Sequence, residues 1–496
     1  MATRNAFPSG LVLDAHKQPA AGEPILDVAP PARLRFALDQ GSGVVLEPAV
    51  AVGDVVSVGS VLARPTDDFG AVLHASVSGR VVAIERHDAT SDDGACSCID
   101  VDNDGLDTRD ATVPRGPIDY AALEPAALVE RLREAGIAGL GGAGFPTATK
   151  LATAQARSAR RLLLNGAECE PWICCDDALM RAEADEVVLG GRVLMHALGA
   201  ESCVVAIEDD KPAAIDAVRA AARAGGGDAI VVEVVPAVYP QGAERQLVTA
   251  VFGVEVPTRG LPADVDVTCQ NVATAAAVAR WVRSGEPLVS RVVTVTGSGV
   301  ARPRNVRARF GTPLATLVAA AGGYCGEPLR LIAGGNMTGR ALATDAVGLT
   351  KSINTVLVAT YEDLAPRLAA VEVACIRCGD CADVCPAGLL PQQIHRAVLA
   401  QDADGAVRFG VWDCIDCGCC DYVCPSQIPL ALRFREARQW LRERERAAAR
   451  ATAARTRHER RERRLQEAVA AEQHAFDVAR QQARSGNAPT DPGTTP

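Results

Sequence analysis

Short apolar runs and turn residues alternate through the first hundred residues of the chain. Between residues 40 and 100 the sequence is rich in Val, Gly and Asp, and Gly53-Asp54 and Val58-Gly59 are typical of turns between strands. A further turn precedes the apolar run at 81–84. The pattern predicts a small module built from β-strands.

A regular exchange of strand and helix patterns follows, up to about residue 288. Apolar runs at 162–164 and 204–207 predict buried strands. Apolar residues at helical spacing predict helices at 121–136, 181–198 and 212–223. Strands that alternate with helices predict an α/β core, in which ligand sites form at the carboxyl ends of the strands.

The pattern then returns to strands. A strand at 292–297, a short helix at 313–321 and a second strand at 331–335 resemble a β-grasp domain of the SLBB type. The first module resembles the barrel-sandwich hairpins of lipoyl and biotinyl carriers. Those carriers use a lysine at the hairpin tip, and residues 61–79 contain none. We therefore expect a structural role for this module.

Composition and charge limit what the whole chain can be. Its 496 residues are 48% hydrophobic and 23% charged, as in folded multidomain proteins. The net charge of −10 argues against general nucleic-acid binding. No apolar run approaches the roughly 20 residues of a membrane span. Pro8, Ser9 and Asp14 stand where a signal peptide needs an apolar core. We therefore expect a protein on the cytoplasmic side, without a transmembrane span of its own.

The cysteines indicate metal binding. Nine of the 17 cysteines fall between Cys375 and Cys424, whereas a disulfide scaffold spreads its cysteines through a short chain. The run Cys-x2-Cys-x2-Cys-x3-Cys-Pro begins at Cys375 and again, 39 residues later, at Cys414. This is the spacing of bacterial two-cluster ferredoxins. A pair of structural zinc sites is disfavoured, because zinc ribbons use separate Cys-x2-Cys pairs.

The fourth cysteine of each run is expected to ligate the cluster of the other run, because it begins the next helix and points away from its own loop. This predicts two [4Fe–4S] clusters. The predicted ligands are Cys375, Cys378, Cys381 and Cys424 for cluster 1, and Cys414, Cys417, Cys420 and Cys385 for cluster 2. Cys419 is an extra cysteine and is not expected to be a ligand.

A glycine-rich loop at 139–147 is the second candidate site. It follows a helical pattern and lacks a Gly-Lys-Ser/Thr ending, so it fits neither a Rossmann fingerprint nor a P-loop. Alone, it is equally well explained as a tight turn that packs a helix on a sheet. Three polar segments accompany it, at 165–171, 239–244 and 270–274, and the first directly follows a predicted strand.

These four segments resemble the flavin- and NADH-binding elements of the flavoprotein subunit of respiratory complex I. With the barrel-sandwich start, the β-grasp segment and the paired cluster motifs, residues 25–440 resemble the RnfC (RsxC) family, the NADH-side subunits of membrane Rnf complexes. The resemblance is most specific at 139–150 and in the cysteine repeat. At the N-terminus it is looser: the family's usual Gly-Gly-rich start with His-Pro is replaced by Phe7-Pro8-Ser9-Gly10 and His16-Lys17.

The resemblance implies a pocket for a noncovalent FMN and for NAD(H). Gly141, Gly142 and Gly144 would let the backbone approach the flavin, and Lys150 would supply positive charge near its phosphate. No catalytic side chain is implied, because hydride transfer needs no general base.

Further residues are carried over by position. Phe145 would stack on the nicotinamide nucleotide, and Glu170 would hydrogen-bond it. The rest of the implied wall consists of Asn165, Glu168, Tyr239, Gly242, Glu244, Asn271 and Thr274. For each acid, a helix cap or a solvated carboxylate is the alternative. Leu140 replaces an arginine of the complex I loop, and Ala167 and Ala243 replace acids, which leaves the nucleotide affinity open.

The implied function is that of an electron-transfer subunit of an ion-translocating oxidoreductase. Electrons would pass between NAD(H) and membrane partners, ultimately ferredoxin, through a flavin and two [4Fe–4S] clusters. The implied partners are the other Rnf/Rsx subunits at the cytoplasmic face of the inner membrane, with no nucleic acid. Two alternatives stay open: a soluble flavin/iron–sulfur reductase such as a PduS-type cobalamin reductase, and a cluster-bearing scaffold that relays electrons without binding NADH.

The expected organisation has six parts. They are an N-terminal segment with the barrel-sandwich module at 1–115, a flavin/NADH-binding α/β domain at 116–288, a β-grasp domain at 289–345, a two-cluster ferredoxin-like domain at 365–430, a charged helical tail at 431–484 and a disordered end at 485–496.

The tail carries concentrated positive charge. Residues 431–470 hold 13 Arg and 6 Glu, and neither Gly nor Pro interrupts the helical pattern after residue 433. We expect the tail to hold the acidic body near anionic lipid or acidic partner subunits, with a solvated helix as the alternative. Removal of the chain after Ala431 is expected to leave both clusters intact.

Overall fold

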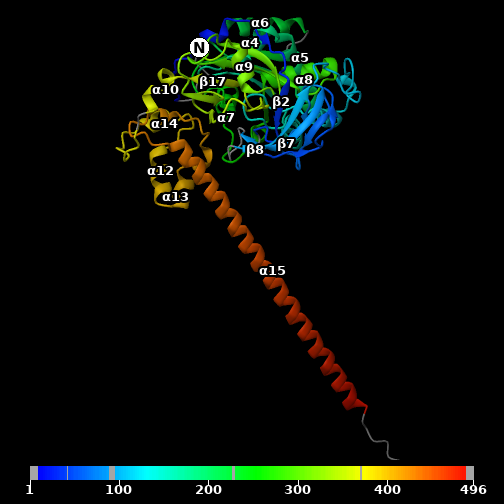
Figure 1. The fold of residues 1–496 in the computed structure, drawn as a ribbon. Coiled ribbons are helices and arrows are strands. Elements are labelled where there is room, and N and C mark those ends of the chain that lie inside the picture. Colours follow the sequence, from blue (N-terminus) through cyan, green and yellow to red (C-terminus); the bar gives the residue numbers. More distant parts are fainter. Residues whose placement is uncertain (1–8, 42, 89–94, 226–228, 369–370, 487–496) are drawn as a thin grey trace, which may run out of the picture.

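The computed structural model describes residues 9–41, 43–88, 95–225, 229–368 and 371–486. Packed sheets and helices form a body from which one long helix projects (Figure 1). The multidomain α/β plus β architecture expected from the sequence is confirmed. Phe7 and Pro8 lie outside the described residues. So do residues 487–496, which make up most of the end at 485–496 that is predicted to be disordered.

Two antiparallel sheets form the first module, as the turn pattern predicts. Their strands are β2 (Arg33–Ala37), β3 (Glu47–Pro48), β4 (Val55–Val56), β5 (Val61–Arg64), β6 (Leu73–His74), β7 (Gly79–Asp88) and β8 (Ala95–Asn103). The strand orders are β2-β8-β7-β4 and β3-β5-β6. Leu34, Phe36, Leu62 and Leu73 bury their side chains between the sheets, which is the usual reason for alternation along such strands.

A parallel sheet forms the centre of the second domain. Its elements are α2 (Pro125–Glu134), α3 (Thr147–Ala156), β9 (Arg161–Gly166), α4 (Cys175–Ala182), α5 (Ala184–Leu198), β10 (Ser202–Glu208), α6 (Pro212–Ala224), β11 (Ile230–Val235), α7 (Glu244–Phe252), β12 (Val267–Asn271) and α8 (Val272–Ser284). The strand order is β11-β10-β9-β12. Leu162 and Leu164 join the core that contains α5 and α8, whereas Leu163 packs with Leu247 of α7 on the other face. Burial on both faces explains the continuous apolar run of β9.

The third domain is a mixed sheet that draws on distant parts of the chain. Its elements are β1 (Leu26–Asp27), β13 (Ser290–Thr296), β14 (Arg304–Arg309), α9 (Leu314–Ala320), β15 (Arg330–Ala333), β16 (Arg340–Leu342) and β17 (Thr355–Ala359). The strand order is β1-β14-β13-β17-β15-β16. Because β17 lies inside the sheet, this packing unit continues past residue 345, where the sequence pattern predicts its end. The short helix α1 (Gln18–Ala21) precedes β1.

Short helices around the cysteine motifs form the fourth domain. They are α11 (Asp380–Asp383), α12 (Pro391–Leu399), α13 (Ala403–Arg408) and α14 (Cys419–Val423), and α10 (Tyr361–Leu368) connects them to the β-grasp sheet. Their core contains Ile394, Ala406, Val411, Ile428 and, from the following helix, Phe434 and Leu441.

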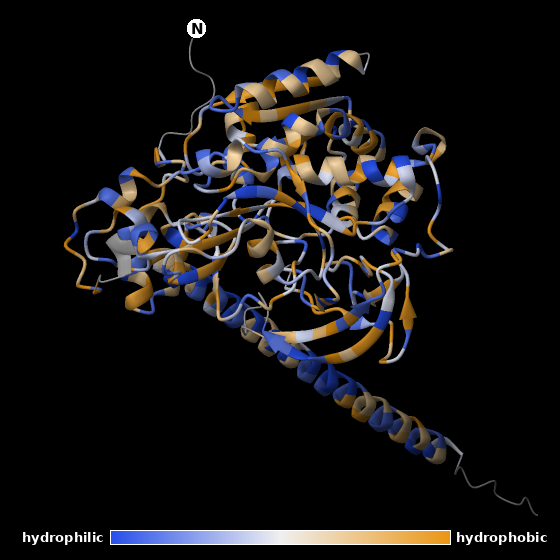
Figure 2. Ribbon diagram, turned by 45° about the horizontal axis from the view of Figure 1, so that its top comes forward, coloured by the Kyte–Doolittle hydropathy of each residue, from blue (hydrophilic) through white to orange (hydrophobic). Residues whose placement is uncertain are grey.

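The projecting helix α15 (Leu430–Ser485) is continuous with this domain. Phe434 and Leu441 are 1% and 5% exposed, and Arg438 is also buried, whereas residues 442–486 are exposed. The first three turns of α15 complete the cluster-domain core, which argues against the expectation that the clusters do not need the chain after Ala431. Hydrophilic residues run along much of the remaining helix (Figure 2). Among the described helices, none has both the length and the apolar character needed to cross a membrane.

Candidate functional site

The glycine-rich loop joins α2 to α3 and exposes bare backbone. Its base is closed by the Gly139 amide, which donates to the Phe145 carbonyl at 2.8 Å. Gly142 has a φ of +110°, a conformation that favours glycine, and it is exposed. A Cβ on Gly141 would lie 3.3 Å from the Asn271 side chain. This cradle of exposed backbone without side chains fits a group that is recognised through the main chain, as a flavin phosphate would be.

The carboxyl ends of β9 and β12 lie beside this loop. Asn165 donates from Nδ2 to the Gly242 carbonyl at 2.9 Å, which ties the end of β9 to the loop before α7. Asn271 caps α8 by accepting from the Ala273 amide at 2.8 Å. The Thr274 hydroxyl accepts from the Leu140 amide of the glycine-rich loop at 2.9 Å. Four of the predicted segments therefore meet at one edge of the parallel sheet.

Lys150 and Glu244 form an ion pair at the same place, with a distance of 2.5 Å between Nζ and Oε2. Desolvation lowers the pKa of Lys150, but the Glu244 carboxylate more than offsets this effect, so the pKa is raised. Both residues were predicted for the pocket wall. As the structure stands, the Lys150 charge is neutralised by Glu244, and a phosphate would have to compete with that carboxylate.

The Glu168 side chain is buried beneath the site, and both of its carboxylate oxygens accept hydrogen bonds. Its carboxylate accepts from the amides of Asp176 and Asp177 at 3.0 and 3.2 Å, at the start of α4, and from the Cys175 thiol at 3.3 Å. Burial and the neighbouring Glu168 raise the pKa of Asp176 to about 7. Glu168, Cys175 and Asp176 also have ligand atoms within 4.8 Å of one another. The helix amides account for the Glu168 oxygens, so this grouping supports the loop that carries Asn165.

Three predicted site residues reach other domains. Glu170 accepts from the amides of Met337 and Thr338 at 2.8 and 2.9 Å and from the Thr338 hydroxyl at 2.7 Å, all in the β15–β16 loop. Tyr239 donates its hydroxyl to the Cys417 carbonyl at 2.5 Å. Phe145 is 37% exposed and lies edge-on to Phe69 of the first module, with 6.4 Å between ring centroids. The site is thus bordered by every domain of the body.

The eight motif cysteines line two separate cavities. One cavity is lined by Cys375, Cys378, Cys381 and Cys424. The other is lined by Cys385, Cys414, Cys417 and Cys420, together with Cys419. We call them the cluster-1 cavity and the cluster-2 cavity. Each contains three cysteines of one motif and the fourth of the other. Four thiols around each of two similar cavities fit two cubane clusters with crossed ligation.

The cluster-2 cavity lies against the flavin-type domain. Besides the Tyr239 contact, Gln246 of α7 donates to the Pro386 carbonyl at 3.2 Å, and Arg245 pairs with Asp413 at 3.2 Å. The loop and helix that border the nucleotide-type site therefore also hold the backbone of a cluster loop.

Family models match the chain in four stretches. These are the RnfC barrel sandwich hybrid domain at 5–106, the Nuo51 FMN-binding domain at 132–280, the SLBB domain at 292–341 and the 4Fe-4S dicluster domain at 368–425. The C subunit of the ion-translocating oxidoreductase complex of Rhodobacter capsulatus is 39% identical over 437 residues, which cover 88% of this chain and 83% of that protein. The chain belongs to the RnfC family.

Other relatives of this RnfC-family chain are longer. The corresponding protein of Pseudomonas aeruginosa is 43% identical over 466 residues, and the match covers 94% of this chain but 59% of the relative. An NAD+-reducing [NiFe]-hydrogenase is 19% identical with a TM-score of 0.45, over 65% of this chain and 61% of that one. The expected FMN-binding and two-cluster domains are confirmed by the family models, whereas the roles of individual site residues stay predictions.

Sequence reasoning missed several residues of the site. Lys17 donates from Nζ to the Glu168 carbonyl, Arg291 contacts the glycine-rich loop, and Arg438 contacts the loop of cluster 2. Each reaches its partner only through the tertiary fold. For Arg291 and Arg438 the sequence signal is a cation within an otherwise apolar strand or helix face, as at Arg291 in β13.

Proposed function

We propose that this chain passes electrons between NAD(H) and the membrane partners of an ion-translocating complex, ultimately to or from ferredoxin. The observation that carries the proposal is the direct contact between the nucleotide-type site and the cluster-2 loop through Tyr239 and Gln246. A bound flavin takes a hydride from NADH and releases electrons singly, which is the exchange that one-electron clusters require.

The residues of the chain bind and orient in this scheme. The exposed backbone of Gly141 and Gly142 binds the phosphate end of the flavin. Asn165 and Asn271 hold the ends of β9 and β12 beside this loop. Lys150 supplies a cation whose charge Glu244 balances until an anionic ligand arrives. Glu170 fixes the β-grasp loop that closes one side of the site. The two cavities hold the clusters through the eight motif cysteines.

The two cavities differ in what they face. The cluster-2 loop lies against the flavin-type domain, whereas Cys375 and Cys378 of cluster 1 are exposed. We infer that cluster 1 is the side offered to a membrane partner, and that cluster 2 stands between it and the flavin.

An anaerobic NADH titration of the purified full chain, followed by visible absorbance and by electron paramagnetic resonance (EPR), tests the proposal. We expect flavin bleaching and the appearance of reduced-cluster signals. Gly142→Val places a branched side chain at a φ of +110° on the exposed cradle and should abolish flavin retention. Gly199→Val, also at positive φ but at the end of α5, is the control that should retain it. A chain that holds clusters but never flavin would instead support the relay scaffold.

The location and partners are proposed on the same grounds. We place the chain peripherally at the cytoplasmic face of the inner membrane, bound to other Rnf-type subunits, with the exposed part of α15 helping to hold it there. Truncation after Arg450 spares the buried turns of α15 and removes eight arginines of the exposed helix, which lie between residues 455 and 484. Membrane retention of this variant should fall, most clearly at raised salt. Full retention would contradict a docking role, and a chain that never sediments with membranes would favour the soluble reductase.

A further inference from the structure

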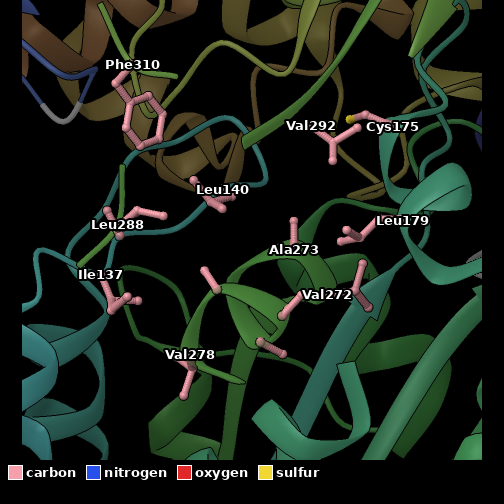
Figure 3. Close-up of a cluster of buried hydrophobic side chains, with 14 of the residues drawn as sticks. Ile137, Leu140, Cys175, Leu179, Val272, Ala273, Val278, Leu288, Val292 and Phe310 are labelled. Carbon is pink, nitrogen blue, oxygen red and sulfur yellow. The ribbon is translucent and has the colours of Figure 1, made fainter. Parts of the chain in front are cut away.

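Leu140 is the point at which the glycine-rich loop is attached to the protein. Its side chain is 2% exposed and lies in the buried cluster that contains Ile137, Leu288 and Phe310 (Figure 3). Its amide donates to the Thr274 hydroxyl at 2.9 Å, and its carbonyl accepts from Arg291 Nη2 at 2.6 Å. The neighbouring residues 141–143 are exposed. The loop is thus anchored at one residue and open at the next three.

Arg291 provides the anchor from another domain. It is the second residue of β13 in the β-grasp sheet and is 1% exposed, which is unusual for a guanidinium. Its guanidinium donates hydrogen bonds to three backbone carbonyls: from Nη2 to Leu140, from Nη1 to Lys351 and from Nε to Val292. The planar guanidinium has donors in fixed directions, so it can hold several carbonyl groups in one geometry, which the ammonium group of a lysine cannot do.

A buried cation needs a negative partner, and the flavin-type domain supplies it. Desolvation lowers the pKa of Arg291, and the nearby Asp176 and Glu168 carboxyl groups oppose this effect. Asp176 in turn accepts from Asn271 Nδ2 at 2.6 Å, and Asn271 caps α8. One buried polar network therefore connects the glycine-rich loop, the start of α4 and the end of β12.

Lys351 likewise binds backbone carbonyls, one of them just before the glycine-rich loop. This residue is completely buried and donates from Nζ to the carbonyls of Gly136 at 2.8 Å and Val72 at 2.6 Å. Gly136 follows α2 and lies three residues before the loop begins. Two buried basic side chains, Arg291 in β13 and Lys351 before β17, thus donate to main-chain carbonyls within and just before the glycine-rich loop.

We propose that the β-grasp domain sets the shape of the flavin loop, and that Arg291 is its positioning residue. This inference rests on the proposed function, since it assigns a role toward the flavin. A glycine-rich segment loses much conformational freedom when it is ordered, so a loop that is already held binds its ligand more tightly than a free one. Arg291 supplies that order without contact with the ligand.

The test compares Arg291→Met, Arg291→Lys and a matched control in the full chain. Arg309→Met removes a guanidinium from the adjacent strand β14, where it binds the Ser76 carbonyl and Asp107 of the first module and does not reach the loop. FMN affinity, measured by quenching of flavin fluorescence, should weaken about tenfold or more in Arg291→Met, as expected for loss of a charge-assisted hydrogen bond. Arg291→Lys should recover part of it, and Arg309→Met should match the unmodified chain.

Hydrogen exchange of the flavin-free protein gives a second readout that does not depend on the cofactor. Amides of residues 139–147 should exchange faster in Arg291→Met than in Arg309→Met, while the iron content of both stays unchanged. Unaltered exchange in this loop together with unaltered FMN affinity would overturn the proposal. If the unmodified chain bound no FMN, the proposed function would fail, and the exchange data would still decide whether Arg291 orders the loop. Should Arg291→Met not fold, the comparison of Arg291→Lys with the unmodified chain applies the same criteria.

Discussion

The cluster-1 and cluster-2 cavities are built from the same spacing of cysteines but have different surroundings. Around the cluster-1 cavity the first two predicted ligands, Cys375 and Cys378, are exposed, whereas the corresponding Cys414 and Cys417 of the cluster-2 cavity are partly buried. The residue just before the second cysteine is Arg377 in one motif and Asp416 in the other, and both have a φ near +60°. The repeat thus keeps the backbone of the loop and changes the charge that it presents.

The two cysteine loops also differ in the residues that pack against them. Asp416 accepts from the buried Arg438 of α15, and the cluster-2 loop also contacts Tyr239 of the flavin-type domain. The cluster-1 loop instead exposes Ile376, which is 65% accessible. Burial, nearby charge and hydrogen bonding to the ligands are the features that set the potential of an iron–sulfur cluster. Identical ligands can therefore give two centres with different potentials and different partners.

The largest effects are expected when the predicted crossed ligands are removed one at a time. Cys385→Ser should remove cluster 2 and reduce the iron content from about eight to about four per chain, because Cys385 lines the cavity of the other motif. Cys424→Ser should remove cluster 1 instead. Iron analysis with EPR of the reduced protein distinguishes the two. Cys419→Ser, a buried thiol in the same cavity, is the control that should keep both clusters. If Cys385→Ser spared cluster 2, the crossed assignment would be wrong.

The next largest effect is expected from shortening α15. Truncation after Ala431 removes Phe434, which lines the cluster-2 cavity, and Leu441 from the shared core. Loss of a large buried apolar side chain costs about 2–5 kcal/mol, so this variant should fail to retain its iron. Truncation after Arg450 leaves both residues in place and should retain about eight irons per chain. Equal iron in the two variants would contradict a structural role for the first turns of α15.

These cases show what the sequence could and could not predict. The cysteine spacing and the glycine-rich loop were recognisable because their chemistry depends on residues a few positions apart. The packing of α15 beyond residue 430 against the cluster domain could not be predicted, because the helix is dominated by Arg and Ala and its three buried turns contribute few apolar residues. The Arg291–Leu140 contact spans 151 residues, and no local pattern encodes it. Sequence reasoning therefore found the cofactor motifs and missed the residues that hold them.

A smaller effect is expected at Arg438, and it concerns the cluster-2 potential. Arg438→Met removes the buried cation that pairs with Asp416 and leaves that carboxylate only the more distant, exposed Arg435. Negative charge disfavours the reduced cluster, so the midpoint potential of cluster 2 should fall by on the order of 50 mV, about 1 kcal/mol for one electron. EPR-monitored redox titration measures both clusters at once, and cluster 1 should not change. Arg435→Met is the matched control, because Arg435 lies 3.9 Å from the same carboxylate but is largely exposed. Equal shifts in the two variants would show that burial of Arg438 is unimportant.

The smallest effect is expected where the flavin-type domain meets cluster 2. Tyr239→Phe removes one hydroxyl that donates to the Cys417 carbonyl at 2.5 Å, while the ring stays buried. One such hydrogen bond contributes about 1 kcal/mol, so both clusters should be retained and the domains should stay associated. The loop that carries Cys417 should nevertheless be held less firmly, and reduction of cluster 2 by NADH, followed by rapid-freeze EPR, should slow by a few-fold. Flavin reduction itself should keep its rate, because the substitution lies on the cluster side. Tyr324→Phe removes a hydroxyl that binds Asp345 at 2.7 Å in the β-grasp domain and should leave both rates unchanged. A slower flavin step with normal cluster reduction would assign Tyr239 to the nucleotide site alone, and the contact between the two centres would then lose its proposed role.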